Sequence, residues 1–243
     1  MVETPVYISG TSADPVVLAS AVIRGEAERR LSAYQAKAAL ITDLRLDGSV
    51  RHEAQADLVD FTVGQIRPYL AATDRVLYAA AAGAAGSRLL VRALRRLRES
   101  IDGHIEALIG AATPDQFAGA AHSVGVELAA AIDLDLTVLV PALAELPGAD
   151  LPGLATDLRT VLDGGDLDTP DVLDVRPIQH GQRHPRIFGR YARLAAGEAF
   201  VLVNNHDPKP LRREFSATYP GEFTWDYLES GPEQWRIRIG RAS

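Results

Sequence analysis

Helix start and stop signals divide the first 160 residues into a few long apolar segments, and they constrain the fold more than any other feature. Asp14-Pro15 places an N-cap residue before a proline at the first helical position, and apolar residues then recur at helical spacing through Ile41. Thr113-Pro-Asp-Gln116 is a capping box with a proline in the first turn, which predicts another helix start. Gly83 and Gly86 interrupt the pattern between these starts.

The resulting pattern predicts four main helices with short connections, which is typical of an up-down four-helix bundle. A polar loop is expected over 43–50, and Pro141 is expected to kink the last main helix. Arg95, Arg96 and Arg98 are expected to face water. The predicted helices cover residues 14–41, 52–82, 87–109 and 113–146, followed by a short helix near 154–162.

Composition and charge both change near residue 170. Residues 1–170 hold 14 basic and 23 acidic side chains, a net charge of -9, whereas residues 171–243 hold 11 and 9, a net charge of +2. The junction is acidic, contains Gly-Gly and ends in proline, as linkers often do. We therefore expect a helical domain over 1–162, a linker over 163–170 and a second domain over 171–243.

The second domain alternates strand-like and helix-like patterns. Asp207 is expected to be the N-cap of its second helix, and Trp225 and Trp235 are expected to lie in its core or at an interface. The order β-α-β-α-β-β is typical of a small two-layer sandwich with two helices on one face of four strands, so the fold class is α + α/β. The predicted strands cover 172–175, 199–204, 222–229 and 234–239, and the predicted helices cover 184–196 and the residues after Pro208.

Composition also excludes several classes of function. The chain has no cysteine, so it forms no disulfide, thiolate metal site or cysteine nucleophile. The acidic first domain argues against nucleic-acid binding. No apolar stretch approaches the roughly 18 residues of a membrane span, and Met1–Tyr7 lacks the basic residues of a secretory signal. We expect a cytoplasmic protein that binds neither nucleic acid nor membranes.

Two segments of the first domain resemble the hemerythrin-like (HHE cation-binding) helical bundle. Residues 66–78, Ile-Arg-Pro-Tyr-Leu-Ala-Ala-Thr-Asp-Arg-Val-Leu-Tyr, are similar to its second helix, and residues 131–143 are similar to its fourth. In that family the two helices carry His-x-x-x-Glu or His-x-x-x-Asp motifs that bind iron. The corresponding positions in this chain are Tyr69, Thr73, Ala131 and Asp135.

The resemblance implies that most of the metal ligands are absent. Only Asp135 of the four positions could still bind iron, the first helix has no His near 24–26, and His104 or Glu99 aligns loosely with a third-helix ligand. A diiron site in a bundle needs about five to seven imidazole or carboxylate ligands. We therefore expect a metal-free bundle whose former cavity is packed by Tyr69 and Ala131, with Asp135 and His104 in solvated or helix-capping roles.

A series of motifs in the second domain resembles the bacterial domain of unknown function 2249, a family similar in fold to the TusA and SirA sulfur carriers. Members of that family occur fused to hemerythrin-like bundles. Sulfur carriers place a cysteine after the first strand, and the corresponding residue here is His180, so persulfide transfer is excluded. The motifs are Leu173–Arg176, Arg183–Phe188, Gly197–Phe200, Val203–Leu211, Pro220–Trp225 and Gly231–Trp235.

Polar residues gather where the two helices of this domain are expected to begin. Both helix starts should follow the carboxyl ends of neighbouring strands, and two helix N-termini beside an arginine and a lysine suit an anion. No catalytic or metal-binding residue is assigned. The predicted ligand-binding residues are Arg183, His184, Asn205, His206, Asp207 and Lys209.

We favour a non-enzymatic protein in which the second domain binds a small anion or a protein partner, without a cofactor, while the first domain provides a scaffold or homodimer contacts. One alternative is a sensor of oxygen or nitric oxide that binds non-haem iron or haem. Another is an acid–base enzyme using His184, His206 and Asp207, although no phosphate loop or Gly-x-Ser-x-Gly motif supports an enzyme. The last alternative is a pure interaction module, which binds another protein and no small ligand.

Overall fold

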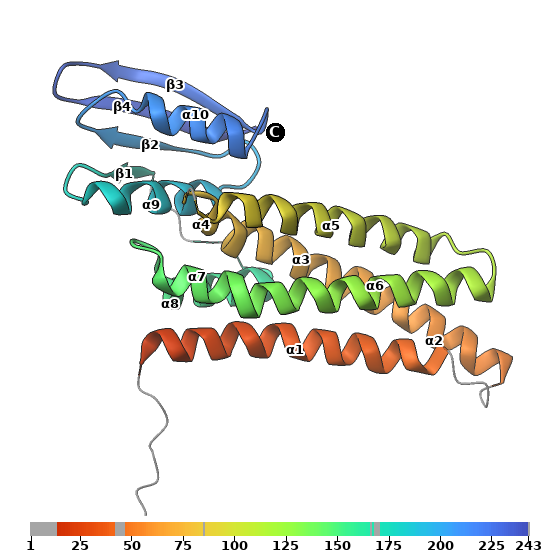
Figure 1. Ribbon diagram of the computed structural model, residues 1–243. Helices are drawn as coiled ribbons and strands as arrows, with labels where there is room; N and C mark the ends of the chain where they lie inside the picture. The colour runs from red at the N-terminus through yellow and green to blue at the C-terminus, as the bar shows by residue number, and fades with distance from the viewer. Residues whose placement is uncertain (1–13, 42–46, 85, 166, 168–170, 243) are drawn as a thin grey trace, which may run out of the picture.

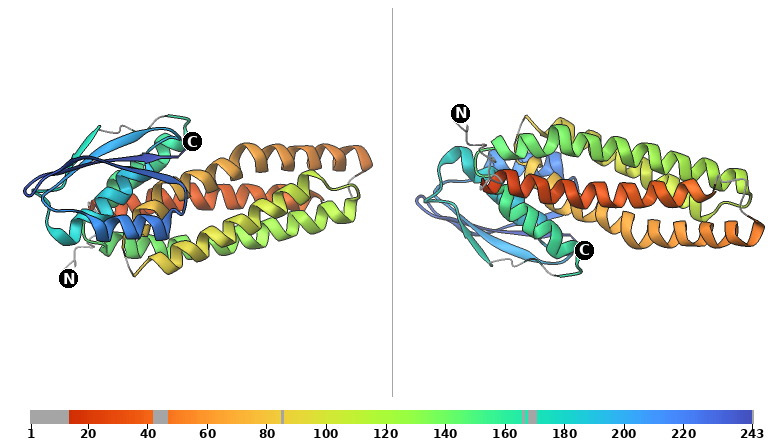
Figure 2. Two further views of the ribbon diagram at one scale, coloured as in Figure 1. Left: turned by 90° about the horizontal axis from the view of Figure 1, so that it is seen from above. Right: turned by 90° about the horizontal axis from the view of Figure 1, so that it is seen from below.

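The computed structural model describes residues 14–41, 47–84, 86–165, 167 and 171–242. The chain has a helical N-terminal part and a C-terminal part that combines helices with a mixed four-stranded sheet, which confirms the coarse prediction. The C-terminal part lies at one end of the elongated helical part (Figures 1 and 2). The predicted loop and linker lie partly outside the described residues, and Met1–Tyr7 lies wholly outside them.

Within the described residues, the helical part contains four long helical segments and a shorter final helix, α8. The first segment contacts the second, the fourth and α8, while the third contacts the fourth. The segments are α1 (Pro15–Ile41); α2 (Gly48–Phe61), η1 (Thr62–Ile66), α3 (Arg67–Thr73), η2 (Asp74–Tyr78) and α4 (Ala79–Ala82); α5 (Arg88–Ile109); α6 (Pro114–Leu134), η3 (Asp135–Leu139) and α7 (Val140–Glu145); and α8 (Leu151–Leu162).

Side-chain caps start these helices where the sequence signals predict them. The Asp14 carboxylate accepts a hydrogen bond from the backbone N–H of Val16 at 2.8 Å. The Thr113 hydroxyl accepts one from the backbone N–H of Gln116 at 3.2 Å. The second segment begins at Gly48, four residues earlier than expected, because Asp47 acts as its N-cap.

Three π-helical stretches, η1, η2 and η3, interrupt the long segments without ending them. The first ends two residues before Pro68 and the third ends two residues before Pro141. A proline has no N–H to donate, so the regular α-helical ladder is already broken at these points. At the position where a kink at Pro141 was predicted, the helical segment continues, and the π-helical stretch η3 lies just before the proline. Such stretches often accompany functional positions in helices.

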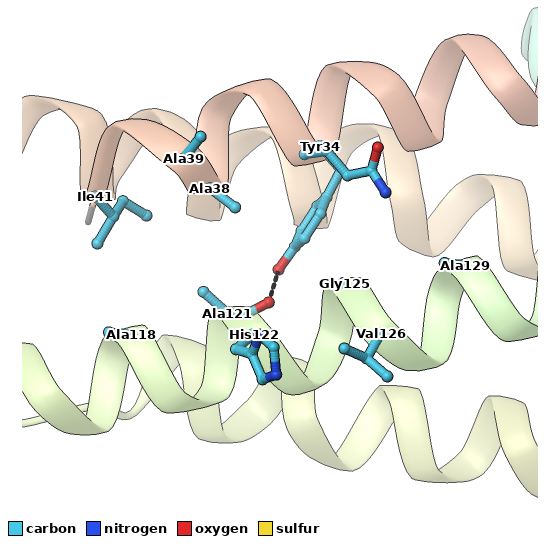
Figure 3. Close-up of a pocket in the computed structure, with 11 residues that line it drawn as sticks. Tyr34, Ala38, Ala39, Ile41, Ala118, Ala121, His122, Gly125, Val126 and Ala129 are labelled. Carbon is cyan, nitrogen blue, oxygen red and sulfur yellow. Dashed lines mark hydrogen bonds between the residues drawn. The ribbon is translucent and has the colours of Figure 1, made fainter. Parts of the chain in front are cut away.

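Helices α1 and α6 pack through Tyr34, whose side chain is fully buried. Its hydroxyl donates a hydrogen bond to the carbonyl of Ala121 at 2.8 Å (Figure 3). Gly125 makes room for the ring, because a Cβ at this position would lie 3.2 Å from Tyr34 Cε1. An open groove of about 490 Å³ runs between the two helices beside this contact, and alanine is the most frequent residue in its lining.

The C-terminal part has the predicted order of elements, and its sheet has the strand order β1-β2-β4-β3. Strands β1 and β2 are parallel, whereas β4 pairs in antiparallel fashion with both β2 and β3. The elements are β1 (Val172–Asp174), α9 (His180–Ala192), β2 (Ala199–Asn204), α10 (Lys209–Thr218), β3 (Phe223–Ser230) and β4 (Trp235–Arg241).

The alternation of buried and exposed residues along the strands gives the sheet one covered face. Phe215 of α10 lies against Trp225 of β3, with ring centroids 5.7 Å apart, and stacks on Phe188 of α9 at 4.4 Å. On the other face, Arg236 and Arg238 of β4 are exposed. The aromatic rings therefore form a core between the sheet and its helices.

The two parts of the chain are joined by a polar and aromatic interface. Arg95 of α5 hydrogen-bonds Asp74 at 2.8 Å, and its guanidinium lies 5.0 Å from the centre of the Tyr219 ring. Arg75 donates a hydrogen bond to the carbonyl of Arg193 at 2.8 Å, and Arg193 also pairs with Asp157 of α8. The prediction that Arg95 faces water is wrong, because Asp74 and the C-terminal part both bind its side chain.

Within the part of the chain that the structure describes, no helix combines the length and the apolar character that crossing a membrane requires.

Candidate functional site

A small cavity of about 50 Å³ lies at the carboxyl ends of the parallel strands β1 and β2, beside the start of α9 and of α10. Parallel pairing places both strand ends at the same edge of the sheet, as the sequence argument expected. The cavity therefore collects polar residues from two connections that lie about 25 residues apart in the sequence. Its lining comprises Val175, His180, Arg183, His184, Ile187, Asn204, His206, Pro208, Pro210 and Leu211.

Arg183 is a buried polar residue of the cavity, with only 8% of its surface exposed. Its guanidinium donates to the carbonyl oxygens of Ile178 at 2.8 Å and Arg176 at 3.2 Å. It also donates to the side-chain oxygens of Asn204 at 3.3 Å and Asn205 at 3.2 Å. All these acceptors are neutral, and among the described residues no carboxylate pairs with Arg183. The buried guanidinium of Arg183 thus has no carboxylate within ion-pair distance among the described residues.

His184 also lines the cavity, and one of its ring nitrogens is held by a carboxylate from α10. Its Nδ1 lies 2.9 Å from Oε2 of Glu214 on α10. Oε1 of the same carboxylate lies 3.7 Å from Arg88 of the helical part. A carboxylate that holds one imidazole nitrogen fixes the ring and leaves Nε2 as the nitrogen available to a ligand.

The prediction that Arg183 and His184 open the first helix of this domain is wrong. Helix α9 begins at His180, so both residues lie in its second turn and Pro185 lies inside the helix. Pro185 is the sixth residue of α9, beyond the first four N–H groups that lack intrahelical partners, so the helix forgoes one i→i−4 hydrogen bond at this point. His180 is consequently the residue at the helix N-terminus.

His180 and His206 face each other across the cavity, with ring centroids 5.7 Å apart. His206 is exposed, and its Nδ1 lies 2.8 Å from the side-chain oxygen of Asn205. The Asn204 amide donates to the carbonyl of His206 at 3.0 Å and so fixes the connection after β2. Three imidazoles therefore line the same cavity as the buried arginine.

Asp207 and Lys209 lie next to the cavity but do not line it. The prediction that Asp207 caps α10 is wrong: the helix begins at Lys209 after Pro208, without a side-chain cap. The Asp207 carboxylate instead accepts a hydrogen bond from the Tyr227 hydroxyl at 2.9 Å and pairs with the Lys209 ammonium at 3.3 Å. Tyr227 of β3 thus binds the Asp207 carboxylate that the sequence pattern had assigned to capping α10.

Two residues of the site were missed by sequence reasoning. Asn204 was assigned to the end of a strand only, although its side chain bonds both Arg183 and His206. Glu214 lies within a helix whose neighbouring arginines suggested a solvated surface. The only available signal was its spacing, since it follows Leu211 by three residues on one helix face.

The cavity does not fit the metal or haem alternatives. Within the described ranges, no group of three or more His, Asp or Glu side chains is arranged to hold a metal ion. A cavity of about 50 Å³ is also far too small for a porphyrin. Its dimensions and its cationic and imidazole groups suit a small anion instead.

The interior of the helical part contains the positions implied by the hemerythrin-like resemblance. Tyr69, Thr73 and Ala131 are buried, and the Thr73 hydroxyl donates to the carbonyl of Tyr69 at 2.9 Å. Asp135 is 3% exposed, so the solvated or capping role expected for it is wrong. Its Oδ2 accepts a hydrogen bond from the Tyr78 hydroxyl at 3.1 Å. Burial raises the pKa of Asp135 to about 7, although the Tyr78 hydrogen bond opposes this shift.

The other acidic residue in this interior is held by arginines. Burial alone would raise the pKa of Glu26, but hydrogen bonds from Arg30, Arg29 and Arg159 lower it to about 2. His104 pairs with Glu127 at 3.2 Å and is partly exposed. Asp135 is buried, has a raised pKa and is held by Tyr78, and Glu26 is bound by arginines. Both are poor ligands for iron, because a metal needs free, ionised or imidazole donors. The donor set therefore does not fit a diiron centre.

Comparison with known proteins adds one finding. Residues 172–241 match the family model described as Uncharacterized conserved protein (DUF2249). The comparisons with curated proteins and with solved structures returned no match. The match spans all four strands and both helices that build the cavity, and so places the candidate site within the matched region.

Proposed function

We propose that the C-terminal part binds a small oxyanion in the cavity between β1, β2 and the starts of α9 and α10. The observation that carries this proposal is the buried guanidinium of Arg183, which has only neutral hydrogen-bond acceptors among the described residues. Burying an unpaired charge is costly, and an anion in the adjacent cavity would supply the missing counter-charge.

The groups around Arg183 support the same ligand class. An imidazole donates from both of its ring nitrogens only when it is protonated. In that form His184 and His206, whose Nδ1 atoms lie beside Glu214 and Asn205, can donate from Nε2 to an anion. His180 and His206 are not bound by a carboxylate among the described residues. Lys209 adds a positive charge nearby, although Asp207 partly neutralises it. The small volume favours an ion the size of phosphate or sulfate, or the charged end of a larger molecule.

We further propose that the helical part is a metal-free relative of the hemerythrin-like four-helix bundle and acts as a scaffold. Tyr69, Thr73 and Ala131 fill the implied ligand positions, and Asp135 is held by Tyr78. For the C-terminal part we propose a TusA/SirA-like two-layer fold. Its β-α-β-α-β-β order supports this proposal, while the absence of cysteine from the chain excludes persulfide chemistry.

A second candidate function is acid–base catalysis on the bound anion. It is favoured by one observation, the bond between His184 Nδ1 and Glu214, because a carboxylate-held imidazole is a common general base. Asp207 does not join this pair, since Tyr227 and Lys209 hold its carboxylate. The acid–base residues proposed for this second function are therefore His184 and Glu214, in place of the sequence-based set of His184, His206 and Asp207.

Calorimetric titration of the full chain with inorganic phosphate and with sulfate, in a chloride-free buffer at pH 7, tests anion binding. We expect the wild type to bind, and Arg183→Gln to bind about tenfold more weakly or worse, since hydrogen bonds to a charged group contribute about 1.5–3 kcal/mol. Arg186→Gln is the matched control, because Arg186 is exposed on the same helix.

Because Arg183 is buried, its replacement can also disturb folding. The double variant His184→Ala/His206→Ala is therefore titrated as well, after circular dichroism has verified its fold. We expect it to lose measurable phosphate binding. Equal affinity in wild type and both variants, or no binding by the wild type, would contradict the proposed function.

A further inference from the structure

The cavity wall is connected to the helical part through one shared carboxylate. Glu214 contacts His184 with Oε2 at 2.9 Å and faces Arg88, the first residue of α5, with Oε1 at 3.7 Å. All three side chains are partly buried at the junction between the two parts. The orientation of His184 therefore depends on a residue outside the C-terminal part.

The backbone of α9 is also seated on the helical part. Gly83, which follows α4, packs so closely that a Cβ there would lie 3.1 Å from two Phe188 atoms and 3.2 Å from the His184 carbonyl oxygen. Gly83 has an ordinary helical conformation, with φ of -67°, so its role is close approach and not backbone freedom. Helix α9 carries His180, Arg183 and His184, and this contact helps to set where they lie.

We propose that the helical part is a structural component of the anion site, and that the α4–α5 junction sets the anion affinity of the cavity through Gly83, Arg88 and Glu214. This inference rests on the function proposed above. It gives the helical part a defined role: it holds α9 against Gly83, and it fixes the Glu214 carboxylate so that His184 presents Nε2 to the ligand.

The electrostatics give the direction of the effect. Around His184, the charged groups are Glu214 on α10, Arg88 on α5 and Arg183 on α9. Removing Arg88 takes away a positive charge near the anion and releases the carboxylate that orients His184. Both changes weaken anion binding. A methyl group at position 83 pushes α9 and its three site residues away from their positions, which also weakens binding.

Phosphate titration of full-length Arg88→Gln and Gly83→Ala tests the proposal. Each has a matched control: Arg92→Gln lies one turn along α5 and is exposed, and Gly86→Ala adds a Cβ with no atom within 4 Å. We expect at least a threefold loss of phosphate affinity in Arg88→Gln and in Gly83→Ala, and no change in either control.

A second measurement separates coupling from a general loss of stability. Because coupling between two sites is reciprocal, phosphate should slow amide hydrogen exchange in wild-type residues 79–83 and 88–92, none of which lines the cavity. The phosphate-induced protection should disappear in Arg88→Gln, which removes a partly exposed ion pair and leaves the core intact.

The outcomes distinguish this inference from the proposed function. If the wild type binds phosphate and Arg183→Gln does not, but Arg88→Gln and Gly83→Ala bind like the wild type, the inference is wrong and the proposed function stands. If phosphate leaves exchange at the α4–α5 junction unchanged, the inference is likewise wrong. If the wild type binds neither phosphate nor sulfate, both proposals are overturned.

Discussion

The Tyr78 hydroxyl donates a hydrogen bond to Asp135 Oδ2 at 3.1 Å in the interior of the helical part. The other carboxyl oxygen, Oδ1, is buried and has no hydrogen-bond partner among the described residues. Because burial raises the pKa of Asp135 to about 7, against 3.8 for an ordinary aspartate, the folded protein holds a proton there that the unfolded chain releases above about pH 4. The native state thus binds more protons between pH 4 and 7.

This difference predicts a pH-dependent effect of Asp135→Asn. The stability contributed by the protonated Asp135 is lost as the pH rises from about 4 to about 7, because ionising a buried carboxyl is unfavourable. Asparagine is neutral at every pH. We expect the stability of Asp135→Asn relative to the wild type to increase from pH 5 to pH 8, by an amount on the order of 2 kcal/mol.

Urea unfolding of both proteins at intervals between pH 4.5 and 8 measures this effect. Asp133→Asn serves as the control, since Asp133 is exposed two residues away on the same helical segment. A stability difference between wild type and Asp135→Asn that stays constant from pH 5 to pH 8 would show that Asp135 is ionised in the folded protein.

The donor set of the helical interior predicts that the protein is purified without stoichiometric iron. Glu26 is bound by three arginines and Asp135 is neutral in the acidic range, so neither is a free ligand. Metal analysis and an absorption spectrum of untagged protein from iron-replete cells measure this. One equivalent of iron, or a haem band, would refute the metal-free scaffold and favour a gas or redox sensor.

The contact between α1 and α6 predicts that Tyr34→Phe destabilises the helical part. The variant removes the 2.8 Å hydrogen bond to Ala121 and leaves a buried carbonyl with one partner fewer. A bond of this kind contributes about 1 kcal/mol, which corresponds to a fall of about 2–4 °C in Tm for a chain of this size. Calorimetry checks the change. Tyr227→Phe, at an exposed strand, should lower Tm less; an equal Tm for Tyr34→Phe and wild type would contradict the argument.

The position of Asp207 predicts a gain of function on removing its charge. The carboxylate pairs with Lys209 and adds negative charge beside a cavity that is proposed to bind an anion. Asp207→Asn should therefore raise phosphate affinity by about threefold, since a like charge near the ligand is removed. Asp226→Asn, exposed on β3, is the comparison. Weaker phosphate binding by Asp207→Asn would show that Asp207 organises the site.

Features determined by neighbouring residues could be predicted from the sequence. The α1 start at Asp14-Pro15 and the strand 199–204 follow from short-range capping and β-branched patterns, and both agree with the structure. The start of α9 was predicted near Pro185, because a proline often marks the first helical turn. The helix in fact begins at His180, and Pro185 lies in its second turn.

Features determined by distant partners could not be predicted in this way. Asp207 has the spacing of an N-cap, but Tyr227, twenty residues later, takes its oxygen. The spacing of Glu214 from Leu211 only assigns it to a helix face, and folding places it between His184 and Arg88. Asp135 has the sequence context of a polar helix position, and its burial depends on how the long segments pack.

Two-dimensional amide NMR of the full chain during titration with inorganic phosphate can locate the anion site around Arg183. We expect saturable shifts confined to residues 175–184 and 204–211, together with the α4–α5 junction, and no such shifts in Arg183→Gln. Absence of shifts near Arg183 in the wild type, or saturable shifts centred on another surface, would show that the anion does not bind there.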